Sequence, residues 1–497
     1  MEKTEHTASL IKNAFYKGLL NIFNLIIPIF TIPYLYRVLS PTSMGNFEYA
    51  NTLFTYFNLW GVLGIYTYGI REISRIRDHK EQVNETYTSL FSIGIFSNLI
   101  VWCVFIALAY IGFHNTPIFR LLLLFSLNLI SNIFYTEWIN EAFEDFRFIT
   151  IKTGIIRLLY VAGIFTFIQS PDDLWKYVAL IVVSNFLNYI CSFVYSRRYT
   201  HFSLLTFRLS RNDFRKYLPP LFFILILDNS AMFYTALDRI MLGSLGESQM
   251  VAYYSVGQRI MDMARSLLIT ITYVSLPRLS YYLGNDESLY QSGLQRLLRI
   301  GLLLAIPMAV GLGLLSKDIV LIFSGEQYMP AVLPLIIFSI RIITLLIENI
   351  TASQVLFLHK KEKLVATINI LWGIGNLCAN YSLFQLGIFS PVTAILSTLC
   401  IELGLLTTEF YYIRRKLHIR INLLTESVFK YVVFALLFIP IIYTIKATEA
   451  SVFLILPLSM SSCMLLYATC LYLSKDELYL ILYAKFKQTI KAKLTHQ

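Results

Sequence analysis

The segment Leu19–Leu35, which reads LLNIFNLIIPIFTIPYL, decides the fold of this 497-residue chain together with a second apolar run at 47–68. Each run approaches the roughly 20 helical residues needed to cross a bilayer core about 30 Å thick. A turn at Ser40-Pro41 separates the runs, and the basic stretch 71–77 follows the second one. Because positive residues gather in cytoplasmic loops, these features predict a helical hairpin that starts and ends on the cytoplasmic side.

The composition excludes a water-soluble fold. Hydrophobic residues make up 57% of the chain and charged residues only 14%, whereas soluble domains carry about 25% charged residues. The net charge of +11 comes mainly from short loops between apolar runs, so we expect contact with the lipid bilayer and no nucleic-acid partner. The six cysteines lie inside apolar runs without C-x-x-C spacing, which indicates buried thiols and no metal site.

Apolar runs recur along the whole chain and predict about fourteen transmembrane helices. Their expected positions are 12–38, 46–68, 86–112, 119–140, 151–169, 174–196, 217–242, 250–275, 297–316, 331–357, 363–385, 390–413, 428–446 and 450–473. The loops that this count places inside, such as 71–80 and 147–152, are basic, whereas the outside loops 243–249 and 386–390 have no Lys or Arg. This asymmetry predicts that both termini are cytoplasmic.

A weak internal repeat relates the opening hairpin to a second predicted hairpin, formed by the seventh and eighth spans. The segment Arg37-Val38-Leu39 before the first turn is similar to Arg239-Ile240-Met241 in the seventh predicted span. Two copies that start on the same side are typical of two parallel lobes related by an axis along the membrane normal. We therefore expect an all-α integral membrane protein with two pseudo-symmetric six-helix lobes and two extra C-terminal helices. The expected parts are an N-lobe at 1–199, a cytoplasmic linker at 200–216, a C-lobe at 217–416, helices thirteen and fourteen at 417–474, and an amphipathic basic cytoplasmic tail at 475–497.

Ionisable side chains inside the predicted spans are the candidate functional residues. A charge at mid-bilayer costs about 2.5–3.5 kcal/mol on insertion scales, so these groups are expected to face protein or water. We predict that five arginines bind the substrate, namely Arg37, Arg239, Arg259, Arg265 and Arg341. We predict that three carboxylates take part in coupling to H⁺ or Na⁺, namely Asp228, Asp262 and Glu348.

Structural interpretations of the same residues stay open. Arg259, Asp262 and Arg265 recur at i, i+3 and i+6, a spacing that also suits a self-neutralised ladder along one helix. Arg341 and Glu348 are seven residues apart on one helix face, which suits an ion pair as well as a substrate contact. Three further pairs are interpreted first as structural, namely Arg37 with Glu48, Glu137 with Glu141, and Glu402 with Glu409. A part in proton or sodium coupling stays open for the two glutamate pairs.

Motifs of ATP-driven and metal-dependent enzymes are absent from the sequence. There is no G-x-x-x-x-G-K-[ST] phosphate loop, so the chain is not expected to hydrolyse ATP. No H-E-x-x-H motif occurs, and the predicted external loops are too short to hold an enzyme site. We therefore predict a transporter without a bound cofactor.

Several short motifs resemble those of Wzx-type oligosaccharide-lipid flippases, which are polysaccharide-export members of the multidrug/oligosaccharidyl-lipid/polysaccharide (MOP) superfamily. The opening hairpin contributes Thr31–Leu39 and Tyr68–Glu72. The seventh and eighth predicted spans contribute Asp238–Gly243 and Ala252–Tyr254, and Phe323–Tyr328 lies between spans nine and ten. The order of these motifs and the number of spans carry the resemblance.

The resemblance implies a MATE-like fold with twelve core helices. It also implies that the cargo is an undecaprenyl-pyrophosphate-linked oligosaccharide repeat unit for O-antigen, capsule or exopolysaccharide assembly. The cargo would move by alternating access from the cytoplasmic to the outer leaflet of a bacterial inner membrane. Arginine suits a pyrophosphate because it pairs oxyanions bidentately. Polysaccharide polymerase and chain-length machinery are further implied partners.

Two other functions remain open from the sequence. A drug/cation antiporter of the same superfamily would share the fold but predicts an acidic cavity, whereas the charges inside the spans here include several arginines. A membrane-embedded polysaccharide polymerase or ligase would be expected to carry a sizeable external loop with catalytic residues. The external loops predicted here are short, so a flippase is the preferred hypothesis.

Overall fold

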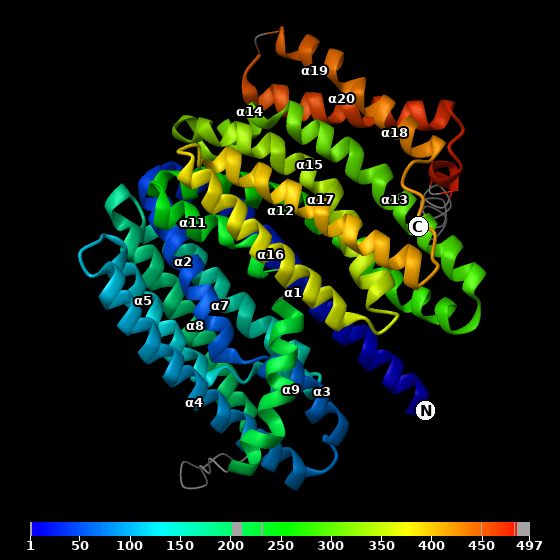
Figure 1. Ribbon diagram of the computed structural model, residues 1–497. Coiled ribbons are helices and arrows are strands. Elements are labelled where there is room, and N and C mark those ends of the chain that lie inside the picture. The colour runs from blue at the N-terminus through cyan, green and yellow to red at the C-terminus, as the bar shows by residue number, and fades with distance from the viewer. Residues whose placement is uncertain (1, 201–210, 230–231, 449, 482, 485–497) are drawn as a thin grey trace, which may run out of the picture. The chain divides into compact units, whose positions relative to one another are not determined.

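The chain is helical throughout the part that the structure describes. A computed structural model describes residues 2–200, 211–229, 232–448, 450–481 and 483–484, and no β-strand occurs in these ranges. Two compact units are present, Met1–Ala252 and Tyr253–Gln497 (Figure 1). Within the described ranges, nine helices are long and apolar enough to cross a membrane. The all-α membrane fold is therefore confirmed, and helices lie at every predicted position, but the number of fourteen spans stays a prediction.

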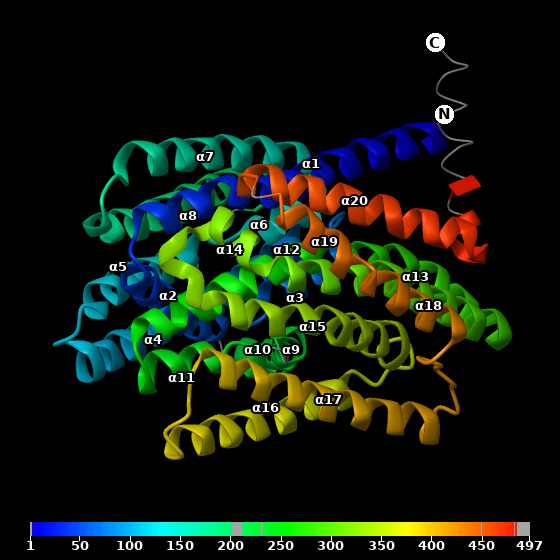
Figure 2. The same ribbon diagram turned by 90° about the horizontal axis from the view of Figure 1, so that it is seen from above.

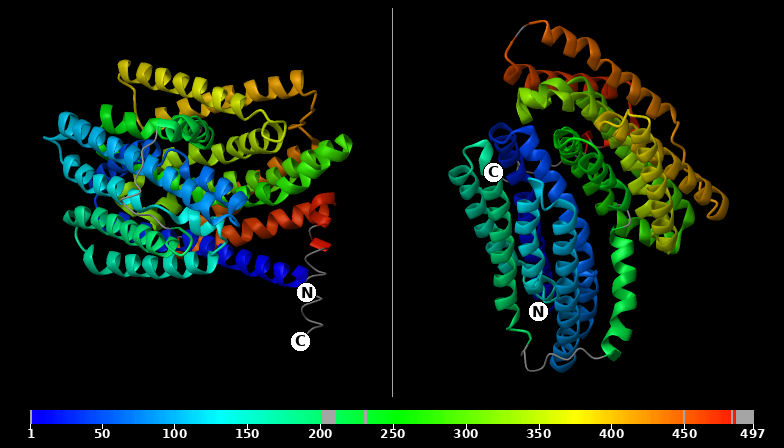
Figure 3. Two further views of the ribbon diagram at one scale, coloured as in Figure 1. Left: turned by 90° about the horizontal axis from the view of Figure 1, so that it is seen from below. Right: turned by 60° about the vertical axis from the view of Figure 1, so that its left-hand side comes forward.

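The first unit is a bundle of long, nearly parallel helices (Figure 3). Its elements are α1 (Glu2–Val38), α2 (Pro41–Val62), α3 (Ile65–Ile76), α4 (Lys80–Phe113), α5 (Ile118–Ser131), η1 (Asn132–Phe134), α6 (Glu137–Ala142), α7 (Phe146–Phe167), η2 (Pro171–Asp173), α8 (Leu174–Ser196), α9 (Arg211–Asn229), α10 (Met232–Thr235), α11 (Leu237–Leu245) and the start of α12 (Ser248–Asn285). Neighbours along the bundle are α2 with α4, α4 with α5, α5 with α8, α8 with α7, and α7 with α1.

The second predicted span is two helices, because α2 ends at Val62 and α3 begins at Ile65. Leu63 and Gly64 between them have φ angles of 50° and 69°. Glycine adopts this backbone region without strain, and a Cβ atom on Gly64 would come within 2.9 Å of the carbonyl oxygen of Leu221. The close approach of α9 therefore accompanies the break.

The fourth predicted span is also interrupted, by the short η1 helix and the residues up to Thr136. Irregular backbone at membrane depth is tolerated only where protein or a water-filled cavity satisfies its polar groups. Trp138, just beyond the break, is 1% exposed, and a Cβ atom on Gly69 would come within 2.4 Å of its ring. The interruption is therefore packed against α3 in the core of the first unit.

The second unit is built around α13, α15 and α17. Its elements are the rest of α12, α13 (Glu287–Leu314), α14 (Ser316–Ser324), η4 (Glu326–Ala331), α15 (Val332–Asn349), η5 (Ile350–Leu356, a π-helix), α16 (Glu362–Gln385), α17 (Pro391–Lys416), α18 (Glu426–Leu436), α19 (Phe438–Lys446) and α20 (Val452–Leu473). α15 packs against both α13 and α17, and α16 lies beside α17 (Figure 2).

The two extra C-terminal helices are an integral part of the second unit. α18 packs against α13, and α20 packs against α14 and α19. Arg299 of α13 donates to Asp476 at 3.0 Å, and the hydroxyl of Tyr431 donates to the same oxygen at 3.1 Å. Lys446 at the end of α19 pairs with Asp318 at 2.6 Å. These polar contacts fix the extra helices in addition to their apolar packing.

The predicted lobe boundaries stay predictions. α9 packs against α2, α3 and α4, and α11 packs against α2, so the first compact unit extends to Ala252. Residues 201–210 of the predicted linker and 485–497 of the predicted tail lie outside the described residues.

Candidate functional site

Arg341 is the most deeply buried of the predicted site residues. Its Nε donates to both carboxylate oxygens of Glu402 at 3.0 Å, and its Nη2 also contacts Oε1. The hydroxyl of Thr344 donates to Oε2 of the same carboxylate at 2.9 Å. Arg341 is 1% exposed and Glu402 3% exposed, and a buried ion requires such a matched and hydrogen-bonded partner. In this structure the guanidinium group of Arg341 is ion-paired with Glu402. A contact of Arg341 with the substrate therefore stays a prediction.

A second carboxylate lies near the predicted coupling residue Glu348. Glu409 of α17 is fully buried, and the hydroxyl of Thr351 donates to its Oε2 at 2.5 Å. Glu348 of α15 is close enough to interact electrostatically with Glu409 and with Arg265 of α12. From the sequence, Glu409 is interpreted first as a packing residue. Its spacing from Glu402 shows which face of α17 it occupies, but not which residues of other helices lie against that face.

The charged residues of α12 form a loose pair along one helix. Arg265 Nη1 lies 3.9 Å from Asp262 Oδ1, and their side chains are 26% and 50% exposed. A partly exposed pair at this distance contributes only about 0–1 kcal/mol. Arg259 is also partly exposed on the same helix. Three of the predicted substrate-binding arginines lie in the second unit. Arg259 and Arg265 keep exposed surface, whereas Arg341 is buried.

Within the first unit, the start of α2 meets the segment 239–248, which is the corresponding part of the similar hairpin. Arg239 Nη1 of α11 lies 3.5 Å from Oε2 of Glu48 in α2, and the Glu48 side chain is fully buried. The hydroxyl of Ser248 donates to Asn46 Oδ1 at 2.6 Å. Arg239, predicted to bind substrate, therefore has a carboxylate partner from the other hairpin. The predicted pairing of Arg37 with Glu48 stays a prediction.

Two further predicted residues are exposed in the first unit. The hydroxyl of Thr67 donates to Asp228 Oδ2 at 2.8 Å, so this carboxylate links α9 to α3. Arg37 lies in the last turn of α1 and is exposed. A role of Asp228 in ion coupling and of Arg37 in substrate binding stays a prediction.

The prediction that Lys152 lies in a cytoplasmic loop at 147–152 is wrong. α7 begins at Phe146 and buries Lys152, whose side chain is 5% exposed. The ammonium group binds Glu137 and donates to the hydroxyl of Ser192 at 2.6 Å. A buried lysine is stable only with such partners, and these come from α6 and α8. No local sequence signal identifies partners that lie 15 and 40 residues away.

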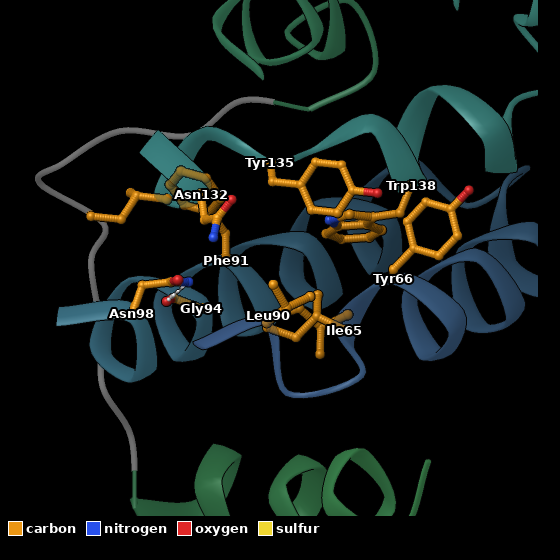
Figure 4. A pocket seen from close by; sticks show the side chains of 11 residues that line it. Ile65, Tyr66, Leu90, Phe91, Gly94, Asn98, Asn132, Tyr135 and Trp138 are labelled. Carbon is orange, nitrogen blue, oxygen red and sulfur yellow. Dashed lines mark hydrogen bonds between the residues drawn. The ribbon is translucent and has the colours of Figure 1, made fainter. Parts of the chain in front are cut away.

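A small cavity lies beside the break in the fourth predicted span (Figure 4). Aromatic and amide side chains line it, among them Tyr66, Asn98, Asn132, Tyr135 and Trp138. Its volume is about 20 Å³, which suits one water molecule. The Asn98 side chain donates to the carbonyl oxygens of Gly61 and Gly94 at 3.1 and 2.8 Å. The cavity is therefore too small for a sugar and belongs to the packing of the first unit.

Metal-binding chemistry has no support among the described residues, where no group of three or more His, Cys, Asp or Glu could hold an ion. The two buried glutamates of α17 are engaged by protein, Glu402 by Arg341 and Glu409 by Thr351. The chemistry that the site offers is therefore pairing between arginine and anionic oxygen.

The fold is shared with two solved transporter structures. The lipid II flippase MurJ in an inward closed conformation matches with a TM-score of 0.72 and 14% identity, over 94% of this chain and 99% of that chain. An inward-facing multidrug resistance MATE family transporter of the MOP superfamily matches with a TM-score of 0.57 and 12% identity, over 80% of this chain and 96% of that chain. The predicted MATE-like fold is therefore confirmed.

Two relatives match over most of their length. A protein named as an O-antigen transporter in Escherichia coli (strain K12) is 24% identical over 416 residues, which cover 81% of this chain and 94% of that protein. A protein of the same name in Shigella dysenteriae is 23% identical over 393 residues, which cover 78% of this chain and 96% of that protein. The model of the family described as "Polysaccharide biosynthesis protein" matches residues 10–283. Because this match takes in more than half of the 497 residues, the chain belongs to the polysaccharide biosynthesis protein family.

Proposed function

We propose that this protein is a flippase that moves a lipid-linked oligosaccharide across the bilayer. The observation that carries the proposal is the match over 94% of the length of a protein named as an O-antigen transporter. The helical membrane fold and its likeness to a lipid II flippase are consistent with this activity. The protein would therefore act as a transporter and not as an enzyme.

The finer parts of the proposal concern cargo, direction and location. The cargo is an undecaprenyl-pyrophosphate-linked repeat unit, moved from the cytoplasmic to the outer leaflet of a bacterial inner membrane. Both termini are cytoplasmic, in line with the basic loops expected on that side. The polymerase and chain-length machinery of polysaccharide assembly act on the product at the outer leaflet.

Arg259 and Arg265 are the proposed contacts for the pyrophosphate. Both keep exposed surface on α12, and the ion pair of Arg265 with Asp262 is loose at 3.9 Å. Arg37 and Arg239 are proposed as further contacts in the first unit. Arg341 is tied to Glu402, so we propose that it positions α15 against α17 and contacts the cargo only if that pair opens.

Reconstitution of the purified protein in vesicles tests the proposed function. Vesicles that carry a lipid-linked oligosaccharide are treated with a membrane-impermeant sugar oxidant, which reads the fraction of sugar in the outer leaflet. We expect the protein to bring the inner-leaflet pool into reach of the oxidant, and protein-free vesicles to leave it protected. A protected pool in both preparations would refute the flippase proposal.

A drug/cation antiporter is the second candidate, because a MATE family transporter shares the fold. The names of the relatives favour a flippase instead. Uptake of a fluorescent organic cation by the same vesicles, without any movement of the lipid-linked sugar, would favour the antiporter.

A further inference from the structure

Helices α15 and α17 carry two pairs of ionisable residues at the same spacing. Arg341 and Glu348 lie seven residues apart on α15, and Glu402 and Glu409 lie seven residues apart on α17. Seven residues make about two helical turns, so the members of each pair share one helix face. Arg341 pairs with Glu402. Two turns further along both helices, Glu348 lies near Glu409, so an acid is placed beside an acid.

Glu409 is a buried carboxyl group with a single hydrogen-bond partner. Its Oε2 accepts the hydrogen bond from Thr351, and its Oε1 has no hydrogen-bond partner among the described residues. Within the described ranges no Lys, Arg or His nitrogen lies within 4.0 Å of its oxygens, whereas Arg341 lies directly on Glu402. An ionised carboxylate in such a place loses its hydration without gaining a counter-charge.

The groups that face Glu409 do not supply the missing positive charge. α17 packs against α15, η5 and α16. α15 presents Glu348, another acid, and η5 presents the neutral Thr351. The α16 side chain Trp372 donates to Thr408, beside Glu409. The neighbouring cation, Arg265 of α12, interacts with Glu348 and also lies near Asp262.

The backbone at this place is unusual as well. α15 changes into the π-helix η5 at Ile350, one residue before Thr351. π-helical turns are rare and occur frequently at functional sites. The side-chain amide of Gln354 in η5 donates to the backbone carbonyl oxygen of Thr272 at 2.9 Å. The backbone carbonyl oxygen of Gln354 accepts a hydrogen bond from the hydroxyl of Tyr290 at 2.8 Å. The widened turn is therefore held in place by α12 and α13.

We propose that Glu409 is a proton-binding site whose carboxyl group is protonated in the conformation of this structure. Binding adds one proton from water to a carboxylate oxygen, and no electrons are transferred. The bound proton neutralises Glu409, as the guanidinium group of Arg341 neutralises Glu402. Release of the proton when α15 and α17 expose the site to water would couple transport to a proton gradient. This coupling rests on the proposed function, whereas the protonation itself does not.

Stability of two matched variants gives the first test. Glutamine has the shape of a protonated glutamate, so Glu409→Gln should keep the melting temperature of the purified protein. Glu402→Gln removes the charge that neutralises Arg341 and should lower it. A Glu409→Gln variant that fails to fold, or that loses as much stability as Glu402→Gln, would overturn the proposal.

Infrared spectroscopy of the resting protein gives the second test. We expect the wild type to show the carbonyl band of a protonated carboxyl group at neutral pH, and Glu409→Gln to lose that component. The exposed acid Glu426, whose side chain is 82% exposed, provides the control, because Glu426→Gln should leave the band unchanged. A band that survives Glu409→Gln, or that is lost only in Glu348→Gln, would place the proton elsewhere.

Coupling is then measured in vesicles that carry lipid-linked oligosaccharide. A pH gradient should change the flipping rate of the wild type and leave the rate of Glu409→Gln unchanged. An equal response of both proteins to the gradient would refute the coupling. Absence of flipping by the wild type would refute the proposed function and leave the infrared result on Glu409 intact.

Discussion

Gly45 lies so close to Ser248 that a Cβ atom on Gly45 would come within 1.7 Å of the Ser248 carbonyl oxygen. The two residues belong to the tips of the similar hairpins, where Ser248 also donates to Asn46. Only a residue without a side chain permits such an approach to another backbone. The docking of α2 against the start of α12 therefore depends on glycine at position 45.

Gly45→Ala should separate these tips. The obstructing atom is a backbone oxygen that cannot rotate away, so we expect a loss of about 1–3 kcal/mol in the free energy of unfolding and slower flipping. Gly284→Ala on α12 is the control, because nothing lies within 4 Å of a Cβ atom there. Melting temperatures of the purified variants measure the effect. Equal values for the two variants would contradict the close contact.

Arg341→Met should destabilise the second unit. Glu402 would remain 3% exposed without its cation, and the loss of one partner of a buried pair costs roughly 3–5 kcal/mol. The double variant Arg341→Met/Glu402→Leu should recover much of this loss, because neither charge is then buried alone. Denaturant unfolding in detergent micelles measures all three proteins.

The matched control for Arg341→Met is Lys430→Met. Lys430 pairs with Glu426 at 2.6 Å on an exposed face, so its loss should cost only about 0–1 kcal/mol. A variant Arg341→Met that keeps full stability and loses only transport would assign Arg341 to the substrate instead.

The helices of this fold could be predicted because membrane burial imposes long apolar runs. The span expected at 390–413 is α17 at Pro391–Lys416, where Ser390 caps the first turn through the backbone N–H of Thr393. The breaks at Leu63-Gly64 and before Glu137 could not be predicted, because the apolar runs continue across them. Their cause is packing between helices, such as the approach of Leu221 to Gly64.

The candidate site was only partly predictable for a related reason. Spacing correctly placed Arg341 with Glu348, and Glu402 with Glu409, on the same side of their helices. Spacing cannot show which helix faces meet, and Arg341 and Glu402 are 61 residues apart. The burial of Lys152 was missed for the same reason, since its partners come from other helices.

Lys152→Met should destabilise the first unit. Among the described residues, Glu137 would keep the hydroxyl of Ser192, at 3.2 Å, as its hydrogen-bond partner. Breaking a buried ion pair costs roughly 3–5 kcal/mol, and the 16% exposure of the Glu137 side chain places the expected loss toward the lower end. The double variant Lys152→Met/Glu137→Gln should be more stable than the single one. Lys430→Met, which removes the partner of the exposed Glu426, is the control in the same thermal unfolding assay. Equal melting temperatures for Lys152→Met and the control would show that Lys152 is not a buried structural cation.

Asp286 should make stability depend on pH. Its Oδ1 accepts hydrogen bonds from Ser288 and from the backbone of Leu289 at the start of α13, and the Ser288 hydroxyl in particular holds the pKa of Asp286 below its ordinary value. A lowered pKa in the folded state stabilises the fold above the unfolded-state pKa of about 3.9, and this contribution is lost as the pH falls through the folded-state pKa.

We therefore expect Asp286→Ala to lower the melting temperature at neutral pH, and its difference from the wild type to shrink below a pH of about 4. Asp286→Asn keeps a capping side chain and should stay close to the wild type at neutral pH. A difference between Asp286→Ala and the wild type that stays constant as the solution is acidified would contradict this assignment.

The double variant Arg259→Ala/Arg265→Ala tests the proposed pyrophosphate contacts. Both side chains are partly exposed, and the pair of Arg265 with Asp262 is loose at 3.9 Å, so their removal should leave the melting temperature nearly unchanged. Flipping should be lost, because a charge-assisted bond to an anion contributes more than a neutral one. Arg296→Ala, at an exposed position of α13, is the control that keeps the transport rate. Full transport by the double variant in the vesicle assay would move the cargo site to other residues, whereas a large fall in its melting temperature would show that the two arginines hold α12 in place.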